Sequence, residues 1–231
     1  MKIPLSSRLL ACCDFVNPGD RVADIGCDHG YLSIYLLTKG IASSIIASDI
    51  KECPLKSAVR NSEKYGVRNK ISFYLSNGVQ NIPREFDTMV CAGMGGDTMI
   101  SILSHAPWLK SSQYRLILQC QSKTPMLRQY LSENGWYIAK ERVLQDGKFL
   151  YTVIEVLWKP GRPLSPGACY FPPALLENTP EDLLAYYRWV VKGLEIVVSN
   201  QKEQANPVKV QALKELKNLP PELSWLKEEN Q

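Results

Sequence analysis

The sequence has few of the residues that build metal centres and disulfide frameworks. Its 231 residues include two histidines, and its seven cysteines form no Cys-x-x-Cys motif. Because seven is an odd number and most of these cysteines sit in apolar runs, we expect reduced thiols in the core. We therefore expect no structural zinc and no other bound metal.

Long hydrophobic runs are also missing. No stretch reaches the roughly 18 uncharged apolar residues of a membrane-spanning helix. The N-terminal segment MKIPLSSRLLACC lacks the long apolar region and the cleavage site of a signal peptide. We therefore expect a cytoplasmic protein without a membrane partner.

Neither sign of charge is in large excess. The net charge is +4, with +5 in residues 1–160 and −1 in residues 161–231. This distribution permits an RNA partner for the N-terminal part but does not require one, since many metabolic enzymes are equally basic.

A strand–turn–helix pattern is present in residues 21–37, RVADIGCDHGYLSIYLL. The apolar run at 22–25 predicts a buried strand, and Gly26 and Gly30 interrupt the pattern before a helix that begins near Tyr31. A helix start offers unpaired N–H groups, and glycines let a ligand approach the backbone closely. This stretch therefore predicts a site for a ligand that carries a carboxylate or a phosphate.

The turn departs from the dinucleotide-binding pattern. A pyrophosphate loop needs G-x-G-x-x-G, whereas Asp28 here would repel a pyrophosphate. The same residues fit the Asp-x-Gly-x-x-x-Gly turn of class I S-adenosylmethionine methyltransferases, with Asp24 at the end of the strand. That cofactor carries a sulfonium and an ammonium group, which acidic residues favour. The alternative is an ordinary strand-to-helix turn that binds nothing.

Two later strands end in polar residues that suit the same cofactor. The strand predicted at 44–48 ends at Asp49, nineteen residues after Gly30, close to the roughly 20-residue spacing at which nucleotide folds place an acid on the ribose hydroxyls. The strand predicted at 71–75 leads to Asn77-Gly78, where such enzymes hold the adenine amine. A helix cap at Asp49 and a plain turn at Asn77-Gly78 are the alternatives.

The fourth strand, predicted at 86–92, runs into Gly93-Met94-Gly95-Gly96. Open α/β sheets place their reacting groups at the carboxyl ends of such central strands. Enzymes that methylate exocyclic amines usually have an Asp or Asn followed by Pro-Pro and an aromatic residue at this point, and this chain has neither. The sequence therefore argues against an N6-adenine or N4-cytosine enzyme of that type.

The remaining pattern of residues 1–160 predicts the fold. A helix at 97–103, a strand at 114–120 and a helix at 124–134 precede two strands at 136–143 and 149–158. The Asp146-Gly147 turn between these two strands predicts an antiparallel hairpin. Parallel strands closed by a hairpin are typical of the α/β, Rossmann-like sheet of class I methyltransferases and not of the dehydrogenase sheet. We expect residues 1–160 to form this S-adenosylmethionine-binding domain.

Residues 161–231 have a different composition. The proline-rich stretch at 159–180 predicts a linker or a wrapping segment. One helix is capped by Thr179 and has Pro180 at its first position, and a second begins at Asn206-Pro207 and is terminated by Pro220-Pro221. Both carry apolar stripes that predict an α-helical hairpin. These stripes are more typical of packing than of chemistry.

Several of these segments carry a family resemblance. LSSRL near the N-terminus, ADIGCDHGYL, AGMGG, LILQ and the final helical hairpin together resemble the TrmK family of bacterial tRNA (adenine-N1)-methyltransferases. The resemblance covers nearly the whole chain. It implies S-adenosyl-L-methionine as the cofactor, tRNA as the partner and N1 of adenine 22 as the methyl acceptor. The chain departs from the family pattern with Cys27 and Gly30 in the first motif and with LILQCQ in place of LILQ-Pro-Asn.

The motifs and the resemblance together assign roles to individual residues. The base or its N6 amine is expected to be oriented by Asp28, with His29 and Tyr31 assisting; these are the expected catalytic residues. RNA contacts are expected at Arg8, Gly95 and Gln121, with Arg8 also suited to the cofactor carboxylate. The residues expected to bind the cofactor are Asp24, Gly26, Cys27, Gly30, Asp49, Ile50, Asn77, Gly78, Ala92, Gly93 and Met94. The alternatives are that Asp28 only caps the helix and that Arg8 is a surface charge.

Other functions stay open at this point. One is a methyltransferase that acts on another RNA nucleotide, and a second is a non-catalytic RNA-binding protein on a methyltransferase fold. A third, an NAD-dependent oxidoreductase, is disfavoured by the missing glycine at the third position of G-x-G, where Asp28 stands, and by the terminal hairpin. We expect a monomer or a weak homodimer.

Overall fold

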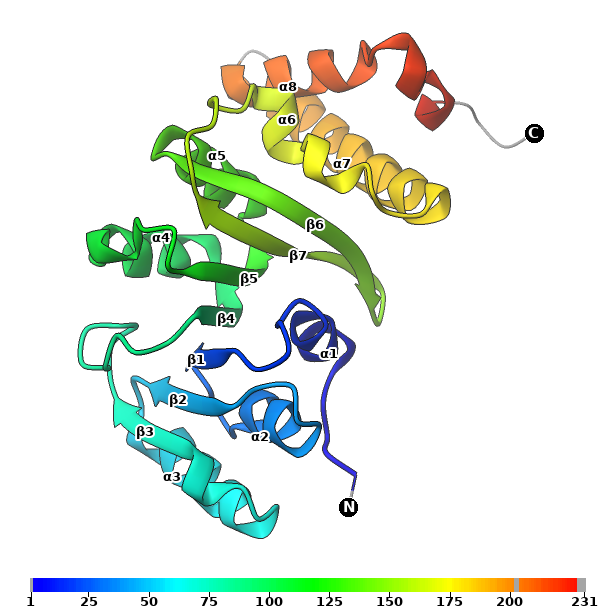
Figure 1. Ribbon diagram of the computed structural model, residues 1–231. Coiled ribbons are helices and arrows are strands. Elements are labelled where there is room, and N and C mark those ends of the chain that lie inside the picture. The colour runs from blue at the N-terminus through cyan, green and yellow to red at the C-terminus, as the bar shows by residue number, and fades with distance from the viewer. Residues whose placement is uncertain (1, 202–203, 228–231) are drawn as a thin grey trace.

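The computed structural model describes residues 2–201 and 204–227, and a seven-stranded sheet forms its centre (Figure 1). The strand order is β3-β2-β1-β4-β5-β7-β6, with β7 antiparallel to its neighbours and the first five strands parallel. The strands are β1 (Arg21–Ile25), β2 (Ser44–Asp49), β3 (Ile71–Leu75), β4 (Thr88–Gly95), β5 (Arg115–Ser122), β6 (Trp136–Asp146) and β7 (Phe149–Trp158). The predicted α/β class, with parallel strands closed by an antiparallel hairpin, is confirmed.

Helices cover both faces of the sheet because alternate residues of the central strands point to opposite sides. In β1, Val22 packs with the helices α1 to α3, while Ala23 and Ile25 pack with α4 and α5. These helices are α1 (Ser7–Cys13), α2 (Tyr31–Thr38), α3 (Glu52–Lys64), α4 (Gly96–Ser104) and α5 (Thr124–Glu133), with short 3₁₀ turns at Arg68–Lys70 and Pro107–Leu109. Two apolar cores therefore hold the central strands from either side.

The boundaries of β4 and β6 differ from the prediction. We predicted that β4 ends at Ala92, but it continues to Gly95 because Met94 and Gly95 still pair with Cys120 and Ser122 of β5, across an irregularity after Ala92. The β6–β7 hairpin is likewise longer and extends to the Asp146–Phe149 pair. The glycine-rich segment is therefore an extended strand end and not a free loop.

The proline-rich stretch is a wrapping segment that contains two short helices, α6 (Pro166–Tyr170) and a 3₁₀ turn at Pro173–Leu175. Cys169, Phe171 and Leu175 are buried. It leads to α7 (Pro180–Gln201), α8 (Pro207–Lys217) and a last 3₁₀ turn at Pro221–Lys227. The description as an extended linker therefore fits at most residues 159–164.

The C-terminal helices lie beside the β6–β7 hairpin, at the opposite end of the sheet from β3 (Figure 1). Thr179 caps α7 through a hydrogen bond from the Asp182 amide, as predicted. Helices α7 and α8 share a third apolar cluster that also includes Val143 of β6. Part of this region, residues 202–203 and 228–231, lies outside the described residues. Within the described ranges, no helix is both long and apolar enough to cross a membrane.

Candidate functional site

The turn after β1 is held in place by the neighbouring strand. The amides of Gly26 and Cys27 both donate to the carbonyl of Ser48 in β2, at 2.8 and 2.9 Å. Gly26 has a φ of +74°, which favours glycine, and a Cβ there would lie 2.2 Å from the methyl carbon of Met94. The turn therefore brings bare backbone beside the end of β4.

Asp24 lies under this turn and is almost fully buried. Its carboxylate accepts a hydrogen bond of 2.6 Å from the Ser33 hydroxyl of α2. Burial raises the pKa of Asp24 to about 6, against the lowering effect of the Ser33 hydrogen bonds. A cationic group placed next to this carboxylate would favour its ionised form.

Asp49 ends β2 and holds the two loops around it. Its carboxylate accepts from the Asp28 amide at 3.2 Å and from the Lys51 amide at 2.8 Å. Ile50, the next residue, is 61% exposed although it is large and apolar. This pair suits a nucleoside, because the acid can accept from the ribose hydroxyls and the apolar side chain can contact the face of the base.

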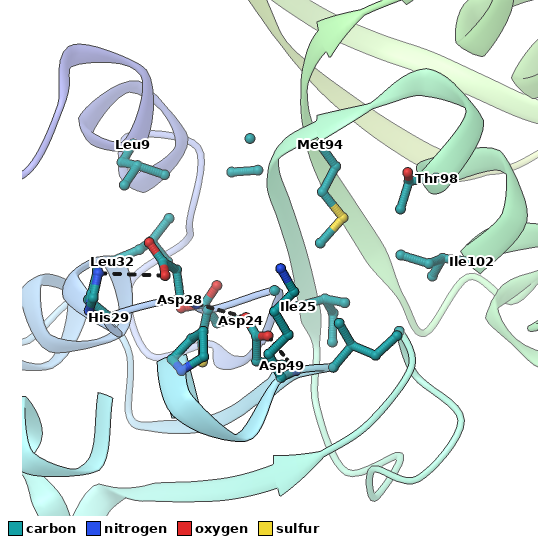
Figure 2. A pocket seen from close by; sticks show the side chains of 18 of the residues that line it. Leu9, Asp24, Ile25, Asp28, His29, Leu32, Asp49, Met94, Thr98 and Ile102 are labelled. Carbon is teal, nitrogen blue, oxygen red and sulfur yellow. Dashed lines mark hydrogen bonds and ion pairs between the residues drawn. The ribbon is translucent and has the colours of Figure 1, made fainter. Parts of the chain in front are cut away.

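Two of the three expected catalytic residues, Asp28 and His29, lie at the mouth of the turn (Figure 2), and the third, Tyr31, begins α2 and also lines the cavity there. Asp28 is exposed and has a φ of +49°, a backbone region that Asp tolerates better than most residues. The His29 ring lies 3.7 Å from the Asp28 carboxylate and 6.1 Å, between centroids, from the Tyr31 ring. These side chains therefore face solvent at one place, where a substrate can reach them.

The glycine-rich end of β4 forms the facing wall. The Gly93 amide donates to the Gln119 side chain at 3.2 Å, and Gly93 itself has a φ of +78°. Met94 reaches across toward Gly26, as Figure 2 shows beside Thr98 and Ile102. The wall is therefore apolar and has backbone groups exposed between side chains.

These parts enclose a cavity of about 510 Å³ at the carboxyl ends of β1, β2 and β4. The strand order reverses between β1 and β4, which is where open α/β sheets bind ligands. The volume is in the range of small-molecule sites. The predicted residues that line it are Arg8, Asp24, Gly26, Cys27, Asp28, His29, Tyr31, Asp49, Ile50, Asn77, Gly78, Ala92, Gly93, Met94 and Gln121.

Two predicted residues do not line the cavity. Gly30 has a φ of +73° at the start of α2 and packs against Ala58, where a Cβ would lie 2.9 Å from that side chain. Gly95 lies farther along β4, beside Ser122 of β5. Gly30 therefore supports the turn from behind, and the direct roles expected for both residues stay predictions.

Several residues that line the cavity were not predicted from the sequence. They are Ser6, Leu9, Ile25, Leu32, Lys51, Pro54, Ser76, Thr98 and Ile102. Most are apolar or small and belong to helix or strand patterns that also predict core packing. Ser76 and Lys51 were the detectable ones, because Ser76 directly follows the strand predicted at 71–75 and Lys51 lies two residues after the predicted strand end at Asp49.

Arg8 lies on the cavity wall and contacts the β6–β7 hairpin. Its guanidinium pairs with Asp146 at 2.6 Å and lies 5.2 Å from the centre of the Tyr151 ring. Gln121, at the exit of β5, is exposed. Both residues therefore sit where the cavity meets the C-terminal half of the molecule.

The cavity suits a cationic nucleoside-type ligand. Three carboxylates line it, those of Asp24, Asp28 and Asp49, against the two basic side chains Arg8 and Lys51. The close approach of Gly26 leaves backbone uncovered for an extended ligand. Over the parts of the chain that the structure describes, no group of three or more His, Cys, Asp or Glu side chains is placed to hold a metal ion.

The fold and the site define a class I, Rossmann-like methyltransferase. A family model described as a methyltransferase domain matches residues 5–154, and the chain belongs to this family. The resemblance to TrmK proteins is also confirmed. The tRNA (adenine(22)-N(1))-methyltransferase of Bacillus subtilis is 32% identical over 154 residues, which cover 66% of this chain and 65% of that protein.

Solved structures extend the similarity to the C-terminal helices. The crystal structure of the B. subtilis m1A22 tRNA methyltransferase TrmK has a TM-score of 0.77 and 28% identity, and the match covers 98% of both chains. Streptococcus pneumoniae Sp1610, in complex with S-adenosyl-L-methionine, has a TM-score of 0.79 and 30% identity over 92% of this chain and 99% of that one. The chain spans 61% to 65% of the length of the first three curated relatives it matches in sequence.

Proposed function

We propose that this protein transfers a methyl group from S-adenosyl-L-methionine to N1 of an adenine in tRNA, at the position that its relatives' names give as 22. The observation that carries the proposal is the arrangement of Asp24, Asp28 and Asp49 around one cavity at the point where the strand order reverses. The similarity to tRNA-modifying enzymes over both halves of the chain supports it.

The residues present fit the proposed cofactor. Asp49 suits the ribose hydroxyls, Asn77 the adenine amine and Asp24 the ammonium group, while the bare backbone at Gly26 gives room for the amino-acid part. When bound, the cofactor supplies an electrophilic methyl group on a sulfonium. The expected roles of Cys27, Gly78, Ala92, Gly93 and Met94 are to line this space.

Asp28 is the proposed partner of the methylated base. N1 of adenine has an in-plane lone pair and no proton to lose, so it needs no general base before it attacks the methyl group. As the new N–C bond would form and the S–C bond to the sulfonium would break, positive charge would pass from the sulfur to the base. An exposed carboxylate at the cavity mouth, with His29 and Tyr31 beside it, can orient the N6 amine and stabilise this charge.

The test is methyl transfer from isotope-labelled S-adenosylmethionine to tRNA transcripts. We expect 1-methyladenosine in digests of the product and a reverse-transcription stop at adenine 22. A transcript with guanine at position 22 is the matched control and should accept no label. Label on another nucleotide would keep the enzyme class and change the target.

A protein substrate is the outcome that would overturn the proposal. Ribosomal protein L11 methyltransferases are also similar, one of them 31% identical over 57% of this chain. Label in a ribosomal protein, with none in tRNA, would assign the chain to that activity. Tight binding of NAD with no binding of S-adenosylmethionine would exclude methyl transfer altogether.

We further propose a monomer or weak homodimer that acts in the cytoplasm. The domain division at residue 160 is also a proposal, and it rests on the lining of the cofactor cavity, all of which lies between Ser6 and Gln121.

A further inference from the structure

A second cavity, of about 350 Å³, lies between the sheet and the C-terminal helices. The end of β5 and the start of α5 form one side, β7 another, and α7 and α8 close it. Its lining includes four aromatic residues, Tyr151, Tyr170, Tyr186 and Trp189. The lining of this cavity therefore comes both from the methyltransferase domain and from the helices that follow it in the chain.

The charge of this cavity is opposite to that of the first one. The second cavity is lined by Lys209 and by Lys123, whose ammonium pairs with Asp97 outside the lining, and no Asp or Glu is among its lining residues. The first is lined by three carboxylates. A cationic cofactor is therefore favoured in the first cavity, and an anionic or aromatic ligand in the second.

The two cavities are neighbours. Gln121 lines both of them, and the Arg8 guanidinium on the wall of the first lies 5.2 Å from the Tyr151 ring on the wall of the second. Occupants of the two cavities would thus be separated by a few side chains. A polymer whose one residue enters the first cavity can place the next residue in the second.

Trp189 is the side chain best suited to contact such a ligand. It is 50% exposed although it lines a cavity, and its ring lies 5.8 Å from that of Tyr186. Tyr186 is buried and accepts a hydrogen bond of 2.9 Å from Arg128. The exposed ring therefore rests on a fixed support, which lowers the entropy that stacking on it would cost.

We propose that the second cavity binds a nucleotide of the tRNA next to the methylated adenine, with its base against Trp189 and its phosphate near Lys209. This rests on the proposed function. N1 lies on the Watson–Crick edge, so the target adenine must be unpaired, and its neighbour loses a stacking partner when the target enters the first cavity. An aromatic side chain replaces that partner, and a lysine neutralises the phosphate.

The test compares Trp189→Leu with Trp189→Phe, using the full chain. Base–aromatic stacking predicts that Trp189→Leu raises both the Kd and the KM for tRNA by about tenfold, whereas Trp189→Phe keeps most of the affinity. The affinity for S-adenosylmethionine should stay unchanged in both. The matched control is Ile196→Ala, since Ile196 is 51% exposed on the same helix and does not line the cavity.

A second pair of variants tests the phosphate contact, and this test does not depend on whether the Trp189 variants fold. Lys209→Ala should weaken tRNA binding and lower the slope of log Kd against log salt by about one. Lys214→Ala, on the same helix but outside the cavity lining, is its control.

The outcomes separate this inference from the proposed function. If the wild-type protein methylates tRNA and neither Trp189→Leu nor Lys209→Ala changes Kd or KM, the second cavity does not bind RNA. If the wild-type protein binds tRNA without methylating it, and both variants weaken that binding, the proposed function fails, and the second cavity binds RNA but not beside a methylated adenine. Equal effects of the cavity variants and their controls would also overturn the inference.

Discussion

At the scale of single residues, Asp24 is a carboxyl group whose ionisation opposes folding. Its pKa is raised from 3.8 to about 6 by burial. Between pH 3.8 and about 6, the folded protein therefore keeps a proton on Asp24 that the unfolded chain releases. The stability that this group contributes is fully present below about pH 4 and is lost as the pH rises through 6.

Asp24→Asn should remove this pH dependence while the amide oxygen still accepts from Ser33. The wild-type protein should lose about 3 kcal/mol of unfolding free energy relative to the variant between pH 4 and 7. Urea unfolding of both proteins at several pH values measures this difference. A difference that stays constant with pH would show that Asp24 does not titrate in this range.

Asp49 is the residue whose loss should affect cofactor binding most directly. Asp49→Ala removes a charged acceptor and the two amide hydrogen bonds that order the loops, so S-adenosylmethionine binding should weaken by about 1–3 kcal/mol. Calorimetry measures this, with Asp87→Ala as the control because Asp87 directly precedes β4, at the amino ends of the parallel strands and away from the cavity. Unchanged affinity in Asp49→Ala would mean that another group holds the ribose.

Asp28 should act on turnover more than on binding. Asp28→Asn keeps the shape and tolerates the positive φ, so the turn should stay intact. If the carboxylate stabilises charge on the base, kcat should fall at saturating cofactor while cofactor affinity changes little. Equal losses in both quantities would return Asp28 to a purely structural role.

At the scale of elements, one buried ion pair joins the hairpin to the C-terminal helices. Arg128 of α5 is fully buried against Glu141 of β6 and donates to the carbonyls of Cys169 and Tyr170 and to the Tyr186 hydroxyl. These partners lie on three different elements, β6, α6 and α7. One guanidinium therefore ties α6 and α7 to the sheet, in addition to the apolar cluster that includes Val143.

Arg128→Ala should cost about 3–5 kcal/mol of unfolding free energy, because it leaves Glu141 charged and buried without its partner. The double variant Arg128→Met with Glu141→Leu should cost clearly less. The control is Arg21→Ala, which breaks the exposed pair with Asp87 and should have a much smaller effect. Denaturant titrations measure the unfolding free energies. Similar losses in Arg128→Ala and in the double variant would contradict the role given to the unpaired Glu141 carboxylate.

In the whole molecule, the C-terminal helices cover part of the core of residues 1–160 but contribute none of their described residues to the lining of the cofactor cavity. The cavity lining lies between Ser6 and Gln121, but Arg128, Glu141 and Val143 are buried by residues after 160. A chain ending at Lys159 should therefore melt at a lower temperature and still bind S-adenosylmethionine below its melting point. Calorimetry and thermal unfolding of this chain test both statements. A folded truncated chain that has lost cofactor binding would show that the division at 160 is wrong.

The sequence determined the parts of this protein that depend on near neighbours in the chain. Periodicity and turn residues predicted the order of strands and helices, and the spacing from Asp24 to Gly30 and Asp49 predicted which strand ends meet. These signals are local. Because the carboxyl ends of parallel strands lie at the same end of the sheet, the residues that follow them are predicted to form one site.

Tertiary structure alone decided the features that need contacts between distant segments. Arg128 has the pattern of an exposed helix residue, and its burial follows from segments more than 40 residues later in the chain. The extension of β4 to Gly95 follows from pairing with β5, and the second cavity follows from the docking of α7 and α8. Periodicity cannot encode these features, because it reports which face of an element is apolar and not which partner covers that face.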